Sequence, residues 1–155
     1  MKTDFMKVAL KEAFSGMRAG DGGPFGAVIV KNGKIVSRAH NCVLKTNDPT
    51  MHAEVGVIRK ATKKLKRFDL SDCVLFTTCE PCPMCFSAIQ WAKIKTIYYG
   101  CTREDAAKIG FSDKEIYDDI KIAPNSKNLT MIPLCNDEIK EPFNEWMKKK
   151  NKKMY

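Results

Sequence analysis

A short stretch rich in cysteine and proline, Cys79-Glu80-Pro81-Cys82-Pro83-Met84-Cys85, limits the possible folds of this chain more than any other part of it. Pro81 and Pro83 are typical of the end of a strand and the first turn of a helix. Cys82 and Cys85 would then lie at a helix N-terminus, where free N–H groups and the helix dipole favour thiolates. The stretch therefore predicts a strand-to-helix junction that is able to bind a metal.

A distant motif, His52-Ala53-Glu54, completes the expected site. His52 can supply a third, neutral ligand beside Cys82 and Cys85, which leaves the fourth tetrahedral position of a zinc ion for water. That arrangement is typical of catalytic rather than structural zinc. Glu54 follows His52 closely enough to exchange protons with that water, so we expect it to act as the catalytic acid and base.

Other interpretations of these residues stay open from the motifs alone. A single Cys-x-x-Cys also occurs in structural zinc sites and redox pairs, and Cys79 extends the run to a pattern found in iron–sulfur proteins. An iron–sulfur site needs a fourth thiolate, however, and Cys101 lacks the spacing of a cluster ligand. A structural zinc site would not need Glu54. Glu54 as a surface residue and His52 as a helix cap are the remaining alternatives.

The order His-x-Glu followed by Pro-Cys-x-x-Cys resembles the signature of the zinc nucleobase deaminases, over nearly the whole chain. The segment from Asp105 to Asp113 and the ending from Pro142 to Tyr155 look, more narrowly, like those of bacterial guanine deaminases. The resemblance implies hydrolysis of guanine to xanthine and ammonia by a zinc-bound hydroxide. Guanosine, cytosine and tRNA adenosine are alternative substrates, and a zinc-stabilised RNA-binding module is the alternative from another class.

Two residues near the first predicted strands are candidates for binding the base. Asn41 follows a strand, and its amide can donate to and accept from a purine edge, although asparagine also forms turns. Phe25 offers a ring for stacking, or else belongs to the core. The resemblance implies that both line the base pocket. The tRNA adenosine deaminases usually carry a smaller aliphatic residue in place of Phe25, which favours a free base as substrate.

The last third of the chain holds two further candidates. The resemblance implies that Asp113 recognises the base or moves protons, but Asp113 also leads a helical segment and suits an N-cap equally well. It further implies a domain-swapped homodimer, in which a segment of about 137–155 crosses to the partner and Tyr155 closes over the bound base. A plain amphipathic helix with a frayed lysine tail is the other interpretation.

Length and composition agree with one enzyme domain over 1–155. With 155 residues, 44% of them hydrophobic, the chain can bury a core without disulfides, and its odd number of cysteines, seven, favours the reducing cytoplasm. We see no export signal and no apolar run of membrane length. The formal net charge of +9 is concentrated in runs at 59–67 and 148–153, which solvated helix faces explain. The charge pattern does not call for nucleic acid or a membrane, and the partner that the resemblance implies is a purine base.

Apolar periodicity predicts alternating helices and strands. Helices are expected at 3–19, 52–65, 82–92, 103–109, 113–119 and 138–152, and strands at 25–30, 35–41, 72–78, 95–100 and 129–133. An Asn32-Gly33 turn joins the first two strands, and Pro142 suits the first turn of the last helix. The predicted fold is a three-layer α/β/α arrangement around a five-stranded mixed sheet, in agreement with the cytidine deaminase-like fold that the resemblance implies.

Overall fold

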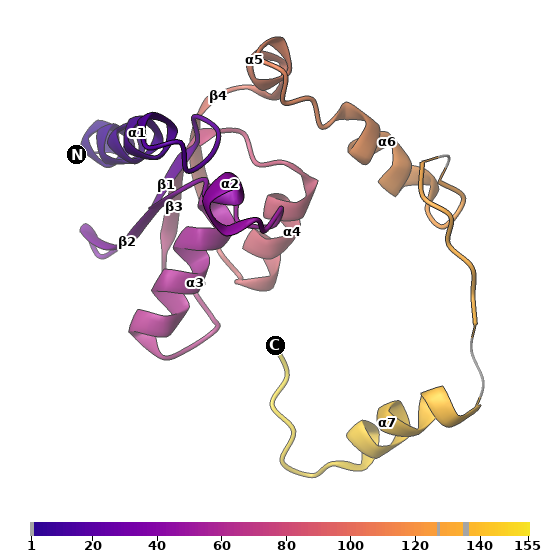
Figure 1. The fold of residues 1–155 in the computed structure, drawn as a ribbon. Coiled ribbons are helices and arrows are strands. Elements are labelled where there is room, and N and C mark those ends of the chain that lie inside the picture. The colour runs from indigo at the N-terminus through magenta and orange to yellow at the C-terminus, as the bar shows by residue number, and fades with distance from the viewer. Residues whose placement is uncertain (1, 127, 135–136) are drawn as a thin grey trace. The chain divides into compact units, whose positions relative to one another are not determined.

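The structure, a computed structural model, describes residues 2–126, 128–134 and 137–155 (Figure 1). The chain divides into two compact units, residues 1–113 and 114–155. The prediction that 1–155 acts as one domain stays a prediction.

The N-terminal unit contains the elements that the sequence predicts up to its end. Its helices are α1 (Lys2–Arg18), α2 (Val43–Thr46), α3 (Ala53–Leu65), α4 (Pro83–Trp91) and α5 (Arg103–Lys108). Its strands are β1 (Gly26–Lys31), β2 (Lys34–His40), β3 (Val74–Cys79) and β4 (Thr96–Cys101). Only α2 was not expected, because one turn of helix is too short to show an apolar period.

The strands form a four-stranded mixed sheet in the order β2-β1-β3-β4. β1 pairs antiparallel with both β2 and β3, whereas β3 runs parallel to β4 with α4 as the crossover. The hairpin between β1 and β2 turns at Asn32 and Gly33, whose φ angles are 49° and 73°. Positive φ at both positions is what the Asn-Gly signal predicts for a type I′ turn.

Helices cover both faces of the sheet, so the three-layer α/β/α prediction is confirmed for the N-terminal unit (Figure 1). On one face, α1 contributes Ala9 to a cluster with Val28 and Phe76 of the sheet. On the other face, α3 and α4 contribute Val57 and Ile89 to the larger core cluster. Alternate residues of β1 and β3 point to opposite faces, which explains how both strands are buried on two sides.

The prediction of a fifth strand at 129–133 is wrong, since residues 128–134 belong to no strand. Leu129, Met131 and Ile132 have the apolar character of a strand, but their side chains are exposed. Strand propensity reflects packing against cross-strand neighbours more than an intrinsic backbone preference. Without a neighbouring strand in the described part of the chain, this apolar run remains irregular.

The C-terminal unit contains α6 (Lys114–Ile122) and α7 (Asp137–Lys148). The placement of Pro142 in the first turn of the last helix is wrong, because Pro142 is the sixth residue of α7. There its ring removes a backbone N–H donor from the helix interior. The chain after Lys148 is not helical, so the last helix ends four residues earlier than predicted. Among the helices described, none is long and apolar enough to cross a membrane.

Candidate active site

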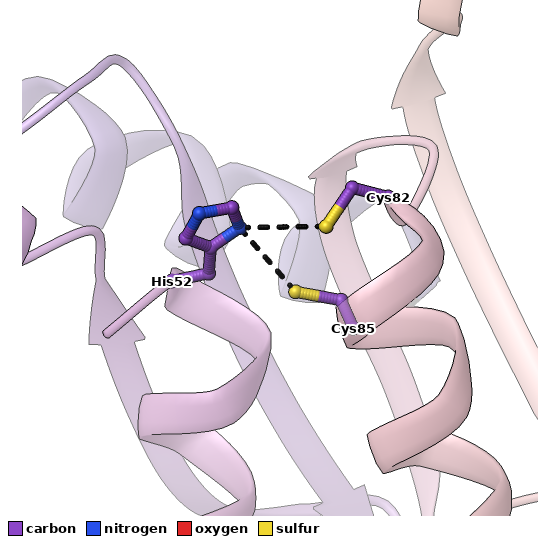
Figure 2. Close-up of side chains that lie close together, drawn as sticks. All are labelled: His52, Cys82 and Cys85. Carbon is purple, nitrogen blue, oxygen red and sulfur yellow. Dashed lines mark hydrogen bonds between the residues drawn. The ribbon is translucent and has the colours of Figure 1, made fainter. Parts of the chain in front are cut away.

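Three metal-ligating side chains converge from the N-terminal ends of two helices (Figure 2). His52 is the N-cap residue of α3, Cys82 is the N-cap residue of α4, and Cys85 is the third residue of α4. Pro83 occupies the first position of α4, as the sequence predicts. His52 is thus a helix cap by position, but its side chain makes no capping hydrogen bond and instead contacts the two cysteines.

The spacing of the donor atoms fits zinc. His52 Nδ1 lies 3.6 Å from Cys82 Sγ and 3.5 Å from Cys85 Sγ. Zn–N and Zn–S bonds of about 2.0 and 2.3 Å at a tetrahedral angle give an N···S separation of about 3.5 Å. One imidazole nitrogen and two sulfurs also match the ligands that zinc prefers over magnesium or calcium. The residues therefore fit a zinc ion with three protein ligands.

The protonation of these groups reflects their close contact. The hydrogen bond from Cys85 and then that with His52 lower the pKa of Cys82 to about 4, while the pKa of Cys85 is raised by the same thiol–thiolate contact and by burial. The pKa of His52 is raised, chiefly by its hydrogen bond to Cys82. These contacts favour a thiolate at Cys82 over one at Cys85. Metal ligation requires both sulfurs as thiolates, which makes the affinity for a metal depend on pH.

Glu54 lies beside these ligands and is buried, with 6% of its surface exposed. Its Oε1 accepts a hydrogen bond from Thr77 Oγ1 at 2.9 Å, and its Oε2 accepts one from Cys85 Sγ at 3.5 Å. Burial is the main cause of the raised pKa of this carboxyl. The alternative of a surface glutamate is therefore wrong. A buried carboxyl with a raised pKa suits a group that must both accept and donate a proton.

Thr77 is a site residue that the sequence reasoning missed. It is fully buried at the fourth position of β3, and its hydroxyl fixes one oxygen of Glu54. The missed signal was strand alternation: Thr77 lies between Phe76, which packs under α1, and Thr78, so its side chain points toward α3. A polar residue on that buried face needs a partner, and Glu54 is the residue that provides it.

Asn41 and Phe25 lie together at the ends of β2 and β1. The backbone N–H of Asn41 donates to the carbonyl of Phe25 at 3.0 Å, and Asn41 is 5% exposed. Asn41 Oδ1 accepts the N–H of Val43 at 3.1 Å, which is the contact of a turn-forming asparagine. Within the described part of the chain its Nδ2 makes no hydrogen bond, so both N–H donors of the amide are available to a ligand.

The roles expected for Asp113 and Tyr155 are not tested by the contacts of their side chains. Asp113 immediately precedes α6, and its Oδ1 accepts a hydrogen bond from Arg103 Nε at 3.0 Å. Its role in base recognition, proton transfer or helix capping stays a prediction. Tyr155 lies in the C-terminal unit with 70% of its surface exposed, and its expected position over a base stays a prediction as well.

Comparisons with known proteins agree with this geometry. Residues 1–101 match the family model of the cytidine and deoxycytidylate deaminase zinc-binding region. The chain is 46% identical to the guanine deaminase of Bacillus subtilis over 97% of each chain. The X-ray structure of guanine deaminase from that organism superposes with a TM-score of 0.94 and covers 99% of this chain and 98% of the other.

More distant relatives match a smaller part of the chain. The tRNA-specific adenosine deaminase of Aquifex aeolicus is 43% identical over 63% of this chain and 64% of its own length. A guanine deaminase structure from Nitrosomonas europaea is 30% identical, with a TM-score of 0.67, and covers 70% of this chain and 63% of the other. Similarity over nearly the whole length is therefore found with the Bacillus protein and not with these two.

Proposed function

Because this chain belongs to the cytidine and deoxycytidylate deaminase family, we propose that it is a guanine deaminase, converting guanine and water to xanthine and ammonia. The observation that carries this proposal is the similarity to a guanine deaminase over 97% of the chain. Similarity to a tRNA-specific adenosine deaminase extends over 63% of the chain. Deamination of tRNA adenosine is for that reason the second candidate.

The proposed cofactor is one zinc ion, held by His52, Cys82 and Cys85. The two N···S separations of 3.5 and 3.6 Å and the choice of donor atoms support it, as does the zinc-binding region of the matching family. When bound, zinc lowers the pKa of a water molecule so that a nucleophile is available at neutral pH.

Glu54 is the proposed acid and base of the reaction. Thr77 fixes Oε1, and Oε2 is turned toward the ligand Cys85, so one carboxylate oxygen faces the metal site. Glu54 accepts one proton from the attacking water and delivers it to the ring nitrogen, and it then passes the second proton of that water to the departing amine. One C–O bond forms and one C–N bond breaks at the carbon that bears the amino group, so that the two water protons end on the ring nitrogen of xanthine and on ammonia.

The proposed base-binding residues are Asn41, Phe25 and Asp113. The amide N–H groups of Asn41 can donate to an acceptor on the purine edge, and their desolvation in a buried site makes a base without that acceptor unfavourable. Phe25 supplies an aromatic surface for the ring. Asp113 can accept from an N–H group of guanine, with Arg103 holding its carboxylate in place.

We also propose that the active form is a cytoplasmic homodimer in which segment 137–155 of one chain covers the active site of the other, with Tyr155 over the base. The exposed apolar residues of the C-terminal unit support this proposal, because they need a surface to cover them. The cysteines of the described residues are all free thiols, which suits a reducing compartment.

Ammonia release from a panel of guanine, guanosine, cytosine, adenine and tRNA tests the proposed reaction. Guanine should have the highest kcat/KM. Ammonia released from tRNA adenosine but not from guanine would mean that the second candidate is correct. An RNA-binding module without catalysis would instead release no ammonia and would lose affinity for tRNA steeply as salt increases.

A further inference from the structure

A loop between α5 and α6 carries an aromatic side chain with no role so far in the proposed site. Phe111 is 48% exposed, yet its ring meets the ring of Phe25 edge to face, with a centroid distance of 5.1 Å and an interplanar angle of 87°. Single exposed aromatic residues are common on protein surfaces. An exposed ring held perpendicular to a second ring beside a proposed base site is a more specific arrangement.

Hydrogen bonds fix this loop relative to the metal ligands. The N–H of Phe111 donates to the carbonyl of Ala106 at 3.0 Å, and the turn passes through Gly110 at a φ of 96°, which side chains rarely adopt. At the two ends of the segment, Arg103 Nε bonds Asp113 Oδ1 at 3.0 Å, and the Arg103 N–H donates to Glu80 Oε2 at 3.3 Å. Glu80 belongs to the same short stretch as the ligand Cys82, so the loop is tied to that stretch.

The rings of Phe25 and Phe111 both lie close to the backbone of Gly23. A Cβ atom placed on Gly23 would lie 2.9 Å from Cε2 of Phe25 and 3.0 Å from Cζ of Phe111. Gly23 therefore leaves room for both rings to approach the same point of the loop that leads into β1. Phe25 also packs partly against the core, and its backbone carbonyl binds Asn41. The corner between the rings is thus linked to the residue proposed to bind the purine edge.

We propose that Phe111 is a second aromatic wall of the base site, and that the corner formed with Phe25 favours fused purine rings over single pyrimidine rings. This inference rests on the proposed deamination of a nucleobase. A flat base that stacks on one ring meets the edge of the other, so the contact grows with the size of the base. Base–aromatic stacking changes affinity by about 5- to 150-fold per base when the aromatic residue is replaced by alanine.

The test compares Phe111→Ala with Phe111→Tyr and with a matched control, Ile109→Ala, which changes a 57% exposed apolar residue of the same loop. Calorimetry should show guanine binding weakened by about 5- to 150-fold in Phe111→Ala, with cytosine binding changed much less. In kinetics, KM for guanine should rise by a similar factor while kcat changes little. Phe111→Tyr should restore binding, and Ile109→Ala should match the wild type.

Zinc content and Tm separate this effect from misfolding, and both should stay at the wild-type values in every variant. Where Phe111→Ala lowers Tm, the comparison is made with Phe111→Leu, which keeps the apolar volume but lacks an aromatic face. Equal guanine binding in Phe111→Leu and wild type, or an equal loss for guanine and cytosine, would overturn the inference. Because binding is measured without turnover, a wild type that binds guanine but does not deaminate it would contradict the proposed function and not the role of Phe111.

Discussion

The two units of the chain differ in how many of their apolar side chains they bury. The N-terminal unit buries a core on both faces of its sheet, in a cluster beneath α1 and a larger one beneath α3 and α4, although some large apolar side chains such as Leu44 and Trp91 stay exposed. In the C-terminal unit no described side chain is buried. Its exposed large apolar residues are Ile116, Ile120, Ile122, Leu129, Met131, Ile132, Leu134, Ile139, Phe143, Trp146, Met147, Met154 and Tyr155.

The two units therefore have different proposed roles, catalysis in the N-terminal unit and assembly in the C-terminal unit. The candidate metal ligands and Glu54 belong to the N-terminal unit, where helix ends and a buried strand fix their positions. The C-terminal unit has helices of 9 and 12 residues, which are marginally stable in water unless an apolar face is packed. Its apolar residues need a covering surface, and a second copy of the chain is the surface we propose. Mutations in the two units should therefore fail in different ways.

The largest effect is expected from Glu54→Gln in the N-terminal unit. Loss of general acid–base catalysis should lower kcat by about 10²- to 10⁴-fold, because an amide cannot take and return a proton. Zinc content measured beside activity should be unchanged, since Glu54 is not one of the three proposed ligands. Glu115→Gln on exposed α6 is the matched control and should keep wild-type kcat. Full turnover by a zinc-loaded Glu54→Gln enzyme would refute the proposed mechanism.

Removal of residues 151–155 from the C-terminal unit should have the next largest effect. If Tyr155 closes over the base of a neighbouring subunit, turnover should fall by roughly tenfold or more, because closure excludes water and completes the site. Zinc should remain bound, and far-UV circular dichroism should be preserved. Sedimentation velocity should give a dimer for the full chain. A monomeric wild type, or a shortened enzyme as active as the full chain, would show that the tail has no such role.

A smaller effect is expected from Asn41→Ala, at the edge of the proposed base site. Loss of the Nδ2 donors should weaken binding of the transition state by about 1–3 kcal/mol. This loss is measured as a lower kcat/KM for guanine, with zinc content unchanged. Asn41 Oδ1 also supports the turn at Val43, so Asn41→Asp serves as the second variant, because it keeps that acceptor but has no donor. If Asn41→Asp binds and deaminates guanine normally, the amide donors are not what recognises the base.

The same contrast between units explains which parts of the fold could be predicted. Long apolar periods predicted α1 and α3, because each of these helices has one face packed on the sheet, and Pro81 and Pro83 predicted the start of α4. The expected strand at 129–133 had the right residue types but no pairing partner in the described chain. An apolar run indicates that burial is needed, without indicating which surface provides it.

The candidate site shows the same division between local and distant contacts. His52, Glu54, Cys82 and Cys85 were predictable because they form two short motifs, His-x-Glu and Pro-Cys-x-x-Cys, whose residue types together indicate a catalytic zinc site even 30 residues apart. Thr77 and Phe111 were not, since each acts through a contact between segments far apart in the sequence, with Glu54 and with Phe25 respectively. Nothing in a lone threonine or phenylalanine indicates which partner the fold will bring to it.

The smallest effect is expected from Asp21→Asn, which tests how the N-terminal unit holds His40 and Lys45, the first of which precedes Asn41 directly. Asp21 is buried between the end of α1 and β2, where its Oδ2 bonds His40 Nε2 at 2.8 Å and Lys45 Nζ at 3.1 Å. These two bonds hold the pKa of Asp21 below its ordinary value, the contact with His40 being the larger cause. A lowered pKa in the folded state stabilises the protein above the unfolded pKa of about 4, and this contribution is lost as the pH falls further.

Asp21→Asn should thus lower Tm slightly at pH 7, and the difference from wild type should shrink below about pH 4. Differential scanning calorimetry across that range measures both, with Glu115→Gln on exposed α6 as the control from the other unit. A Tm difference that stays constant from pH 7 to pH 3 would mean that the charge of Asp21 does not stabilise this corner of the site.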